Sequence, residues 1–487
     1  MNNHSTYIRQ QVGWLAPLAV ALLIAVMVLS FKWLGLAMIL LGIGFFAFLF
    51  VSPLAVLLIW LVLSPIMDFY LRLSLGAGIP DITFTRGVVV GVFFVVLMQS
   101  IFRMRRLWSI SPTEKSMLAF SAMALFTLLF MHNTTQDLQL LLDGYIVPFI
   151  LFFLAKNLIQ EEKDILHLLK TGAIAGSYLA AVGTLQFFTN INLFVPEGFE
   201  SIHENRATGP FINAVQYGGV VSVFFLSTFY LYTLQHRGVY RTILVFSLLL
   251  MALSVLLSMT RASWGALFLA CILIAIFIPK YKNIMIKLPI FLLTGGVVIL
   301  LMMPGTSAFQ ERAFELGPIY SRLALYATGL NTALDNPLLG NGFGRYSFFE
   351  ASRDNLVTFS GISESLGLGL DVPHNEFLHM LVMLGGVGLW LYIYIYYYTI
   401  RSSYILYQYT EGKEFKFRKF MIFFWAISMV VILNSLVADF IFFTYFNGLY
   451  FLIAGTVMGM ISGKDKFLYQ SDSAAPHPLS GRSDTTW

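Results

Sequence analysis

The sequence predicts an all-α integral membrane protein. Of its 487 residues, 58% are hydrophobic and 11% are Asp, Glu, Lys or Arg, whereas charged residues make up about 25% of a typical soluble domain. The apolar residues recur in runs of about 20, the length at which a helix crosses a hydrocarbon layer of roughly 30 Å. A helix is the form expected for each run, because it satisfies its backbone polar groups internally.

Fourteen apolar runs are predicted to span the membrane. The first seven cover residues 14–31, 33–50, 53–71, 87–102, 117–131, 138–155 and 171–189. The second seven cover residues 213–235, 240–258, 262–279, 287–303, 377–400, 419–436 and 440–461. The first run lacks a small-residue cleavage site, which favours a retained span over a removed signal peptide. We therefore expect one polytopic transmembrane domain over residues 1–462, followed by a Ser- and Pro-rich cytoplasmic tail, 463–487, that is disordered.

The distribution of Lys and Arg orients the chain. With the N-terminus in the cytoplasm, 21 of the 30 Lys and Arg residues fall on the cytoplasmic side, as the positive-inside rule requires. Both termini are then cytoplasmic. This topology, rather than binding to nucleic acid, explains the net charge of +5. Eight of the nine outer cations are arginines, whose planar guanidinium suits bidentate binding of phosphate; chance in a small sample is the alternative explanation.

Two outer loops are long enough to carry a functional site, namely residues 190–212 and 304–376. In the second loop, leucines and a tyrosine recur at nearly helical spacing between residues 323 and 334, which predicts a helix lying on the outer surface. Glycines follow in the segment LLGNGFG, which includes Gly342. They indicate a tight turn where backbone approaches a ligand closely. No strand precedes them, so a dinucleotide-binding loop is rejected.

Four ionisable residues lie near predicted span ends on the outer side: Arg206, Arg261, Arg322 and His374. Such residues are functional candidates because an arginine at the centre of a membrane helix costs about 3 kcal/mol, although an interfacial anchor is the alternative role for any one of them. Arg261 has almost no hydrophilic loop around it, and we expect Ser258 and Thr260 to orient it. The Gly-Pro pair after Arg206 indicates a turn that folds back towards the bilayer.

His374 follows Pro373 at the predicted start of a span, where a helix is expected to begin. The helix dipole at such a position lowers the pKa of an imidazole. A neutral imidazole can act as a general base. Asp371 and Glu376 are alternative bases or orienting groups for the imidazole, and Asn375 is a further supporting residue.

The residues do not indicate a metal site or a cofactor. His374 and His379 are five residues apart, so one helix does not present both to one ion, and the single cysteine, Cys271, lies in an apolar run. Guanidinium groups and an imidazole at the outer face instead suit a substrate with a lipid tail and a diphosphate. The arginines would bind the diphosphate as it leaves, and the imidazole would take a proton from an attacking sugar hydroxyl. The predicted reaction is a metal-free glycosyl transfer.

Four segments between residues 200 and 400 together resemble the O-antigen ligase and polymerase superfamily. They are RATGPF from Arg206, SMTRASW around Arg261, NPLLGNGFG around Gly342, and PHNEFL around His374 with GGVG after it; PDITFTR, ending at Arg86, resembles a further segment. The resemblance implies a GT-C-type bundle, a bacterial cytoplasmic membrane and inverting transfer from an undecaprenyl-diphosphate-linked glycan. It also implies that Arg206 and Arg261 contact the diphosphate, that Arg322 assists from the loop helix, and that His374 is the catalytic base or an acceptor-side group.

The superfamily contains polymerases, which extend a lipid-linked repeat chain, and ligases, which move the finished chain onto lipid A core. The number of predicted spans favours a polymerase of a surface or extracellular polysaccharide, with a ligase as the alternative. A transporter of an anionic substrate is a more distant alternative, because Asp143-Gly144 has no counterpart in another span. The expected partners are the lipid-linked donor, a glycan acceptor, membrane lipids, a flippase and a chain-length regulator.

Overall fold

The computed structural model describes residues 44, 47–74, 76, 79–131, 135–195, 206–235, 238–287, 290, 294, 317–344, 347–357, 372–412 and 417–464. Within them, nine helices are long and apolar enough to cross a membrane, and a tenth, Arg261–Phe277, is a shorter apolar helix. This confirms an all-α, multi-pass membrane protein. The predicted spans 14–31, 33–50 and 287–303 and the tail 463–487 lie wholly or mostly outside the described residues.

The first half of the described chain has helical segments over its five predicted spans from 53–71 to 171–189, although the helix over 117–131 is not among the nine candidate spans. Its elements are α2 (Pro53–Tyr70), β1 (Arg72–Leu73), β2 (Ile82–Thr83), α3 (Phe84–Ile101), α4 (Pro112–Met131), α5 (Thr135–Leu141), η1 (Leu142–Ile146), α6 (Val147–Leu158) and α7 (Glu162–Thr189). The two strands form a short antiparallel hairpin that pairs Arg72 with Thr83 between α2 and α3. Helix α7 begins nine residues before its predicted span, because a capping box at Glu161 and Asp164 starts it in the polar segment.

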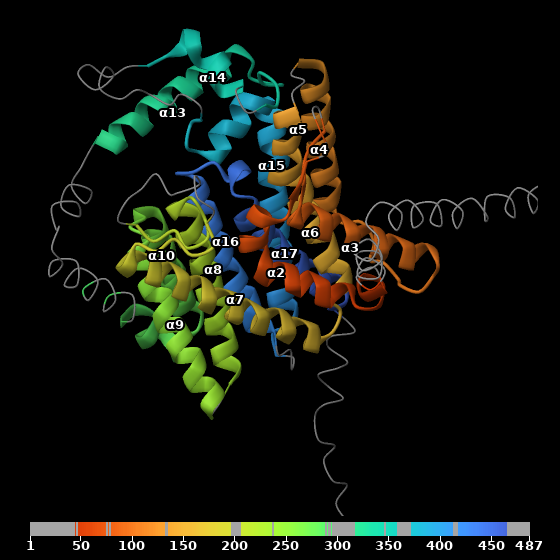
Figure 1. Ribbon diagram of the computed structural model, residues 1–487, viewed down its shortest axis with the longest axis vertical. Coiled ribbons are helices and arrows are strands. Elements are labelled where there is room, and N and C mark those ends of the chain that lie inside the picture. The colour runs from red at the N-terminus through yellow and green to blue at the C-terminus, as the bar shows by residue number, and fades with distance from the viewer. Residues whose placement is uncertain are drawn as a thin grey trace, which may run out of the picture.

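The second half supplies the remaining helices. They are α8 (Ala214–Leu234), α9 (Val239–Leu257), α10 (Arg261–Phe277), η2 (Pro279–Tyr281), α13 (Gly317–Asp335), α14 (Ser347–Ser352), η3 (Arg353–Asn355), α15 (Glu376–Tyr409), α16 (Arg418–Ser435), η4 (Phe440–Phe442) and α17 (Thr444–Ser462). Helix α13 confirms that the second long loop contains a helix. Figure 1 shows α13 and α14 beside one end of α15, which both of them contact.

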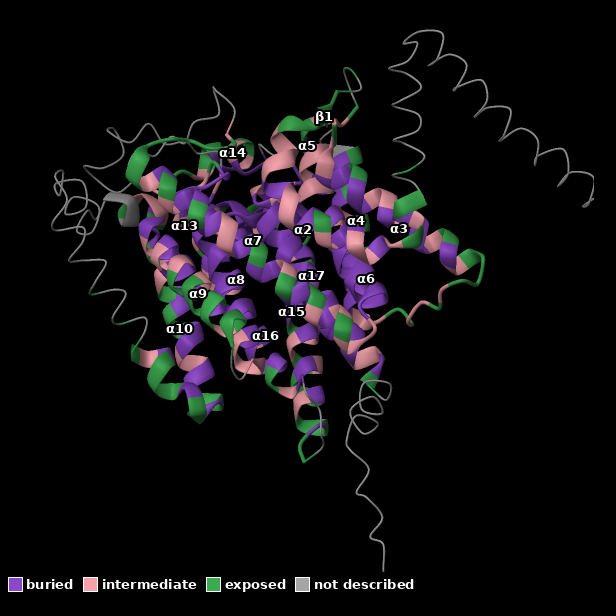
Figure 2. Cartoon of the chain, turned by 60° about the horizontal axis from the view of Figure 1, so that its bottom comes forward, coloured by how far each residue is buried: buried purple, intermediate pink, exposed green. Residues whose placement is uncertain are grey.

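Helices α8 and α17 lie at the centre of the bundle. In each of them 89% of the most apolar window is buried, compared with 33% in α9. Figure 2 shows the buried residues gathered on the inner faces of the helices. Helix α17 packs closely on α6 because glycines of α17 face α6. A Cβ on Gly459 would lie 2.8 Å from the carbonyl oxygen of Lys156. Small residues that let two helix backbones approach are typical of membrane interfaces.

One end of the bundle collects the helix ends on which the predicted site residues lie. Helices α10 and α15 begin there, at Arg261 and Glu376, and α9 and α16 end there. The segment before α8 joins them, because the Ala207 amide donates a hydrogen bond to the Leu257 carbonyl at the end of α9. Arg206, Arg261 and His374 therefore occupy the same end of the bundle, and the assignment of that end to the outer side stays a prediction.

Candidate functional site

Arg206 holds the turn that joins α9 to α10. Its guanidinium donates to the carbonyl oxygens of Ser258 (3.1 Å) and Met259 (3.4 Å) and to the Thr260 hydroxyl (2.9 Å). Met259 has a φ of 51°, which is uncommon for a residue other than glycine. Three of the five N–H donors of Arg206 thus serve this turn. Its contact with a diphosphate stays a prediction, and its observed role is to position the start of α10.

Arg261 is the first residue of α10 and its side chain is exposed. Across the described ranges, no hydrogen bond or ion pair involves its guanidinium. The expectation that Ser258 and Thr260 orient it is wrong, because their hydroxyls donate to the carbonyls of Val255 (2.7 Å) and Ala214 (3.2 Å). A cation at a helix N-terminus, where backbone N–H groups also face outward, is a suitable place for an anion.

The end of α16 connects the α10 turn to the His374 segment. Near the start of α10, the Ser263 hydroxyl donates to the side-chain oxygen of Asn434 in the last turn of α16 (2.9 Å). The Tyr326 hydroxyl of α13 donates to the Leu436 carbonyl (2.8 Å) and lies 3.4 Å from the His374 carbonyl. These contacts bring two segments that are more than a hundred residues apart to the same helix end.

His374 precedes α15 and has a φ of 52°. Asn375 caps the helix by accepting a hydrogen bond from the Leu378 amide (3.1 Å), which confirms that a helix begins here. The His374 side chain is 48% exposed, and its Nδ1 lies 3.7 Å from Oδ2 of Asp439. Partial burial lowers the pKa of the His374 imidazole, the Asp439 carboxylate opposes this, and Arg322 lowers the pKa further. The lowered pKa favours the neutral form of the His374 imidazole, which can accept a proton.

Asp439 is a buried carboxylate between α16 and α17 that faces two histidines. Besides its contact with His374, its Oδ1 lies 3.1 Å from Nδ1 of His379 in the second turn of α15. On a regular helix, two histidines five residues apart would point in different directions. His374 contacts the same carboxylate as His379 because it lies before the helix begins. Among the described residues, no three His, Cys, Asp or Glu side chains form a metal-binding group.

Glu376 is more buried than His374 and contributes to the structure of the bundle. It is fully buried, accepts a short hydrogen bond from the Tyr145 hydroxyl, and accepts another from the Ile441 amide (3.2 Å). Tyr145 belongs to the π-helix η1, whose Asp143 forms two hydrogen bonds with Arg86 (2.6 and 2.7 Å). Because its oxygens are engaged and covered, Glu376 supports the arrangement of α15, η1 and η4, which disfavours the alternative in which Glu376 acts as a base.

Arg322 lies one helical turn before Tyr326 on α13. Tyr326 fixes this helix against the end of α16 and the His374 segment through its hydroxyl. The charge of Arg322 acts on both neighbours, because it lowers the pKa of the His374 imidazole and of the Tyr326 phenol, although burial leaves the pKa of Tyr326 raised. The contact of Tyr326 with the His374 carbonyl, one helical turn from Arg322, therefore places Arg322 near the His374 segment.

Gly342 lies against α15, not at an open surface. Its amide donates to the Met383 carbonyl (2.9 Å). A Cβ on the neighbouring Gly340 would collide with the same carbonyl and with the backbone of Gly385. Gly385 has a φ of 62° and breaks the regular geometry of α15. The close backbone approach that the glycines predict is present, and its partner in the structure is the kink of α15.

Sequence reasoning did not select Asp439, Tyr145 or Tyr326. Asp439 carried a usable signal, because it is an acidic residue between two adjacent predicted spans, where ionisable groups deserve a functional hypothesis. The two tyrosines carried none, because tyrosine is common in apolar helices near the interface. Their partners lie 231 and 110 residues away for Tyr145 and Tyr326, respectively.

The fold and the site define a multi-pass helical membrane protein with an imidazole, a buried carboxylate and arginines gathered at one end. Residues 246–393 match the family model described as O-Antigen ligase. This match, which includes Arg261, Arg322 and His374, supports assignment to the O-antigen ligase and polymerase superfamily and confirms the predicted resemblance. The family suggests a glycosyl-transfer enzyme with O-antigen ligase or polymerase activity. No curated protein matches the chain.

Proposed function

We propose that this protein is a polysaccharide polymerase that transfers a glycan from an undecaprenyl-diphosphate-linked donor at the outer face of a bacterial cytoplasmic membrane. The observation that carries the proposal is the half-exposed His374 beside the buried Asp439, 3.7 Å away. Arg322 acts on the same imidazole, and Arg261 opens α10 at the same end of the bundle. The set combines a base with cations suited to a diphosphate.

In the proposed reaction, His374 takes the proton from a hydroxyl of the acceptor sugar. The hydroxyl oxygen attacks the anomeric carbon of the donor, and the bond between that carbon and the diphosphate oxygen breaks, so the configuration inverts in a single displacement. Arg261 and Arg322 stabilise the charge that develops on the departing lipid diphosphate. Asp439 stabilises the imidazolium that His374 becomes, as a carboxylate does in other histidine-based sites.

A polymerase extends chains that are still lipid-linked, and the fourteen predicted spans support this over the ligase alternative. The test is a strain that lacks the protein and carries either His374→Ala or the control His167→Ala, which changes an exposed histidine on α7 near the opposite end of the bundle. Lipid-linked glycans are extracted and separated by length. We expect single repeats on the lipid carrier in the His374→Ala strain and full-length polymer in the control.

The other results separate the alternatives. Long lipid-linked chains in the His374→Ala strain would identify a ligase, and lipid-linked repeats held in the cytoplasmic leaflet would identify a transporter. Wild-type polymer in the His374→Ala strain would contradict the role of His374 as the base.

A further inference from the structure

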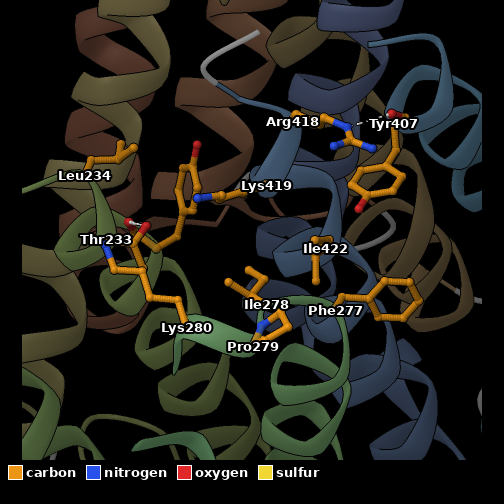
Figure 3. A pocket seen from close by; sticks show the side chains of 11 residues that line it. Thr233, Leu234, Phe277, Ile278, Pro279, Lys280, Tyr407, Arg418, Lys419 and Ile422 are labelled. Carbon is orange, nitrogen blue, oxygen red and sulfur yellow. Dashed lines mark hydrogen bonds between the residues drawn. The ribbon is translucent and has the colours of Figure 1, made fainter. Parts of the chain in front are cut away.

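A second candidate binding site lies at the end of the bundle opposite the His374 site. There, a cavity of about 520 Å³ is bounded by the ends of α8, α10 and α15 and by the start of α16 (Figure 3). Its volume falls in the range of small-molecule sites. Helix α10 begins with Arg261 and meets the cavity at Phe277, so the two places are separated by roughly 24 Å along that helix. The cavity is not part of the candidate active site.

The cavity combines an apolar wall with cations. The apolar and aromatic lining residues include Tyr230, Leu234, Phe277, Ile278, Tyr407 and Ile422. The cations are Lys280, Arg418 and Lys419, and Figure 3 shows that they come from η2 and α16. Such a lining suits a ligand with an anionic head and an apolar tail, and basic pockets between membrane helices on the cytoplasmic side are known to bind acidic headgroups.

Arg418 is held in place by its neighbours. Its guanidinium lies 4.2 Å above the ring of Tyr407 and donates to the Tyr407 carbonyl (3.1 Å). It also lies 3.4 Å from Glu411, whose side chain is 75% exposed. An ion pair this exposed contributes little, so a phosphate can replace Glu411 as the partner. Stacking on an aromatic ring fixes the direction of the guanidinium fork that a phosphate binds.

Lys280 and Lys419 are exposed, and in the described part of the chain neither takes part in an ion pair. Arg241 adds positive charge at this end of the bundle, since its guanidinium donates to the Tyr232 hydroxyl (2.7 Å), two residues before Leu234 of the cavity wall. The described groups around the cavity thus carry more positive than negative charge.

The position of the cavity indicates the source of the anion. Lys280, Lys282, Lys287 and Lys419 lie on described segments at this end of the bundle, and the positive-inside rule assigns such segments to the cytoplasmic side. The headgroups of the inner leaflet are anionic and surround helix ends at this depth. We propose that the cavity binds the headgroup phosphate of an anionic phospholipid, with Lys280, Arg418 and Lys419 around the phosphate and the apolar wall against the lipid chains.

The test measures lipid binding to the purified full-length protein by native mass spectrometry in detergent. The test variant carries Lys280→Gln and Lys419→Gln. The matched control carries Lys282→Gln and Lys287→Gln, which remove the same charge from exposed positions that do not line the cavity. We expect the wild type and the control to bind phosphatidylglycerol, and the test variant to bind it about tenfold more weakly. We expect all three proteins to retain phosphatidylcholine less well than phosphatidylglycerol.

Three results would overturn the proposal. Equal weakening in both double variants would mean that general charge attraction binds the lipid. Equal retention of phosphatidylglycerol and phosphatidylcholine would mean that the phosphate site is not selective for an anion. Binding of inorganic phosphate, sensitive to the two cavity lysines and without bound lipid, would identify a small-anion site instead. Melting temperatures of both variants, expected to match the wild type because all four lysines are exposed, exclude unfolding as the cause.

Discussion

The substitution Asp439→Asn tests the mechanism most directly, because it removes one charge and keeps the shape of the side chain. Asparagine still offers an oxygen to Nδ1 of His379, which lies 3.1 Å from the Asp439 carboxylate, so the packing between α15 and the segment after α16 is expected to survive. The charge that stabilises a protonated His374 is lost.

The distance sets the expected magnitude. At the 3.7 Å between Nδ1 of His374 and Oδ2 of Asp439, a unit charge pair interacts by about 1 kcal/mol in water and about 4 kcal/mol at an effective dielectric constant of about 20. The 48% exposure of the imidazole argues against the upper value, which leaves roughly 1–3 kcal/mol. Since about 1.4 kcal/mol corresponds to a factor of ten in rate, the rate is expected to fall roughly 5- to 150-fold.

The assay is the initial rate of donor turnover in proteoliposomes, measured across pH. Asp439 raises the pKa of His374, so the variant is expected to have a lower maximal rate and an acidic limb that lies at lower pH than in the wild type. A variant with the wild-type maximal rate would refute the development of positive charge on His374 during the reaction. A lower rate with a reduced melting temperature would assign Asp439 a structural role only.

Three further substitutions probe the surrounding residues. Arg322→Ala removes a cation that lowers the pKa of His374, so the acidic limb of the pH–rate profile is expected to move to higher pH, opposite to the shift in the aspartate variant. Arg261→Ala is expected to lower turnover by about 10²–10³ without changing the melting temperature, whereas Arg206→Ala is expected to lower the melting temperature because the α9–α10 turn loses three hydrogen bonds. Gly385→Ala, at a φ of 62° and against neighbouring backbone, is expected to cost roughly 1–3 kcal/mol in a chemical unfolding titration.

Sequence reasoning located the described membrane helices because the bilayer imposes a strict requirement on the backbone. A lipid-exposed segment must satisfy its own backbone hydrogen bonds, so apolar runs become helices. The predicted span 419–436 and helix α16, Arg418–Ser435, differ by one residue at each end. Ends that depend on polar residues were less predictable: α15 continues nine residues beyond its predicted end at 400, to Tyr409.

The site was predictable only in part, because its chemistry depends on contacts that leave no local pattern. His374 and Arg261 were selected from their own surroundings in the sequence. The use of Arg206 by the α9–α10 turn depends on a fold that brings it to residues 52 to 54 positions away. The five-residue spacing also wrongly suggested that His379 and His374 point apart. Helical geometry does not apply to His374, because it lies before α15 and its backbone is in the left-handed region.

Asp439 contacts one histidine inside the bundle and another at its surface. Its carboxylate is buried and faces His379 inside the bundle as well as the half-exposed His374. A buried carboxylate is costly without a partner, and the neighbouring Glu376 has its own partners in Tyr145 and the Ile441 amide. The bundle therefore places a buried carboxylate 3.7 Å from a half-exposed imidazole. In the proposed reaction, this carboxylate stabilises the His374 imidazolium and Arg261, which begins α10 at the same end of the bundle, acts on the diphosphate, although the chain separates the two residues widely.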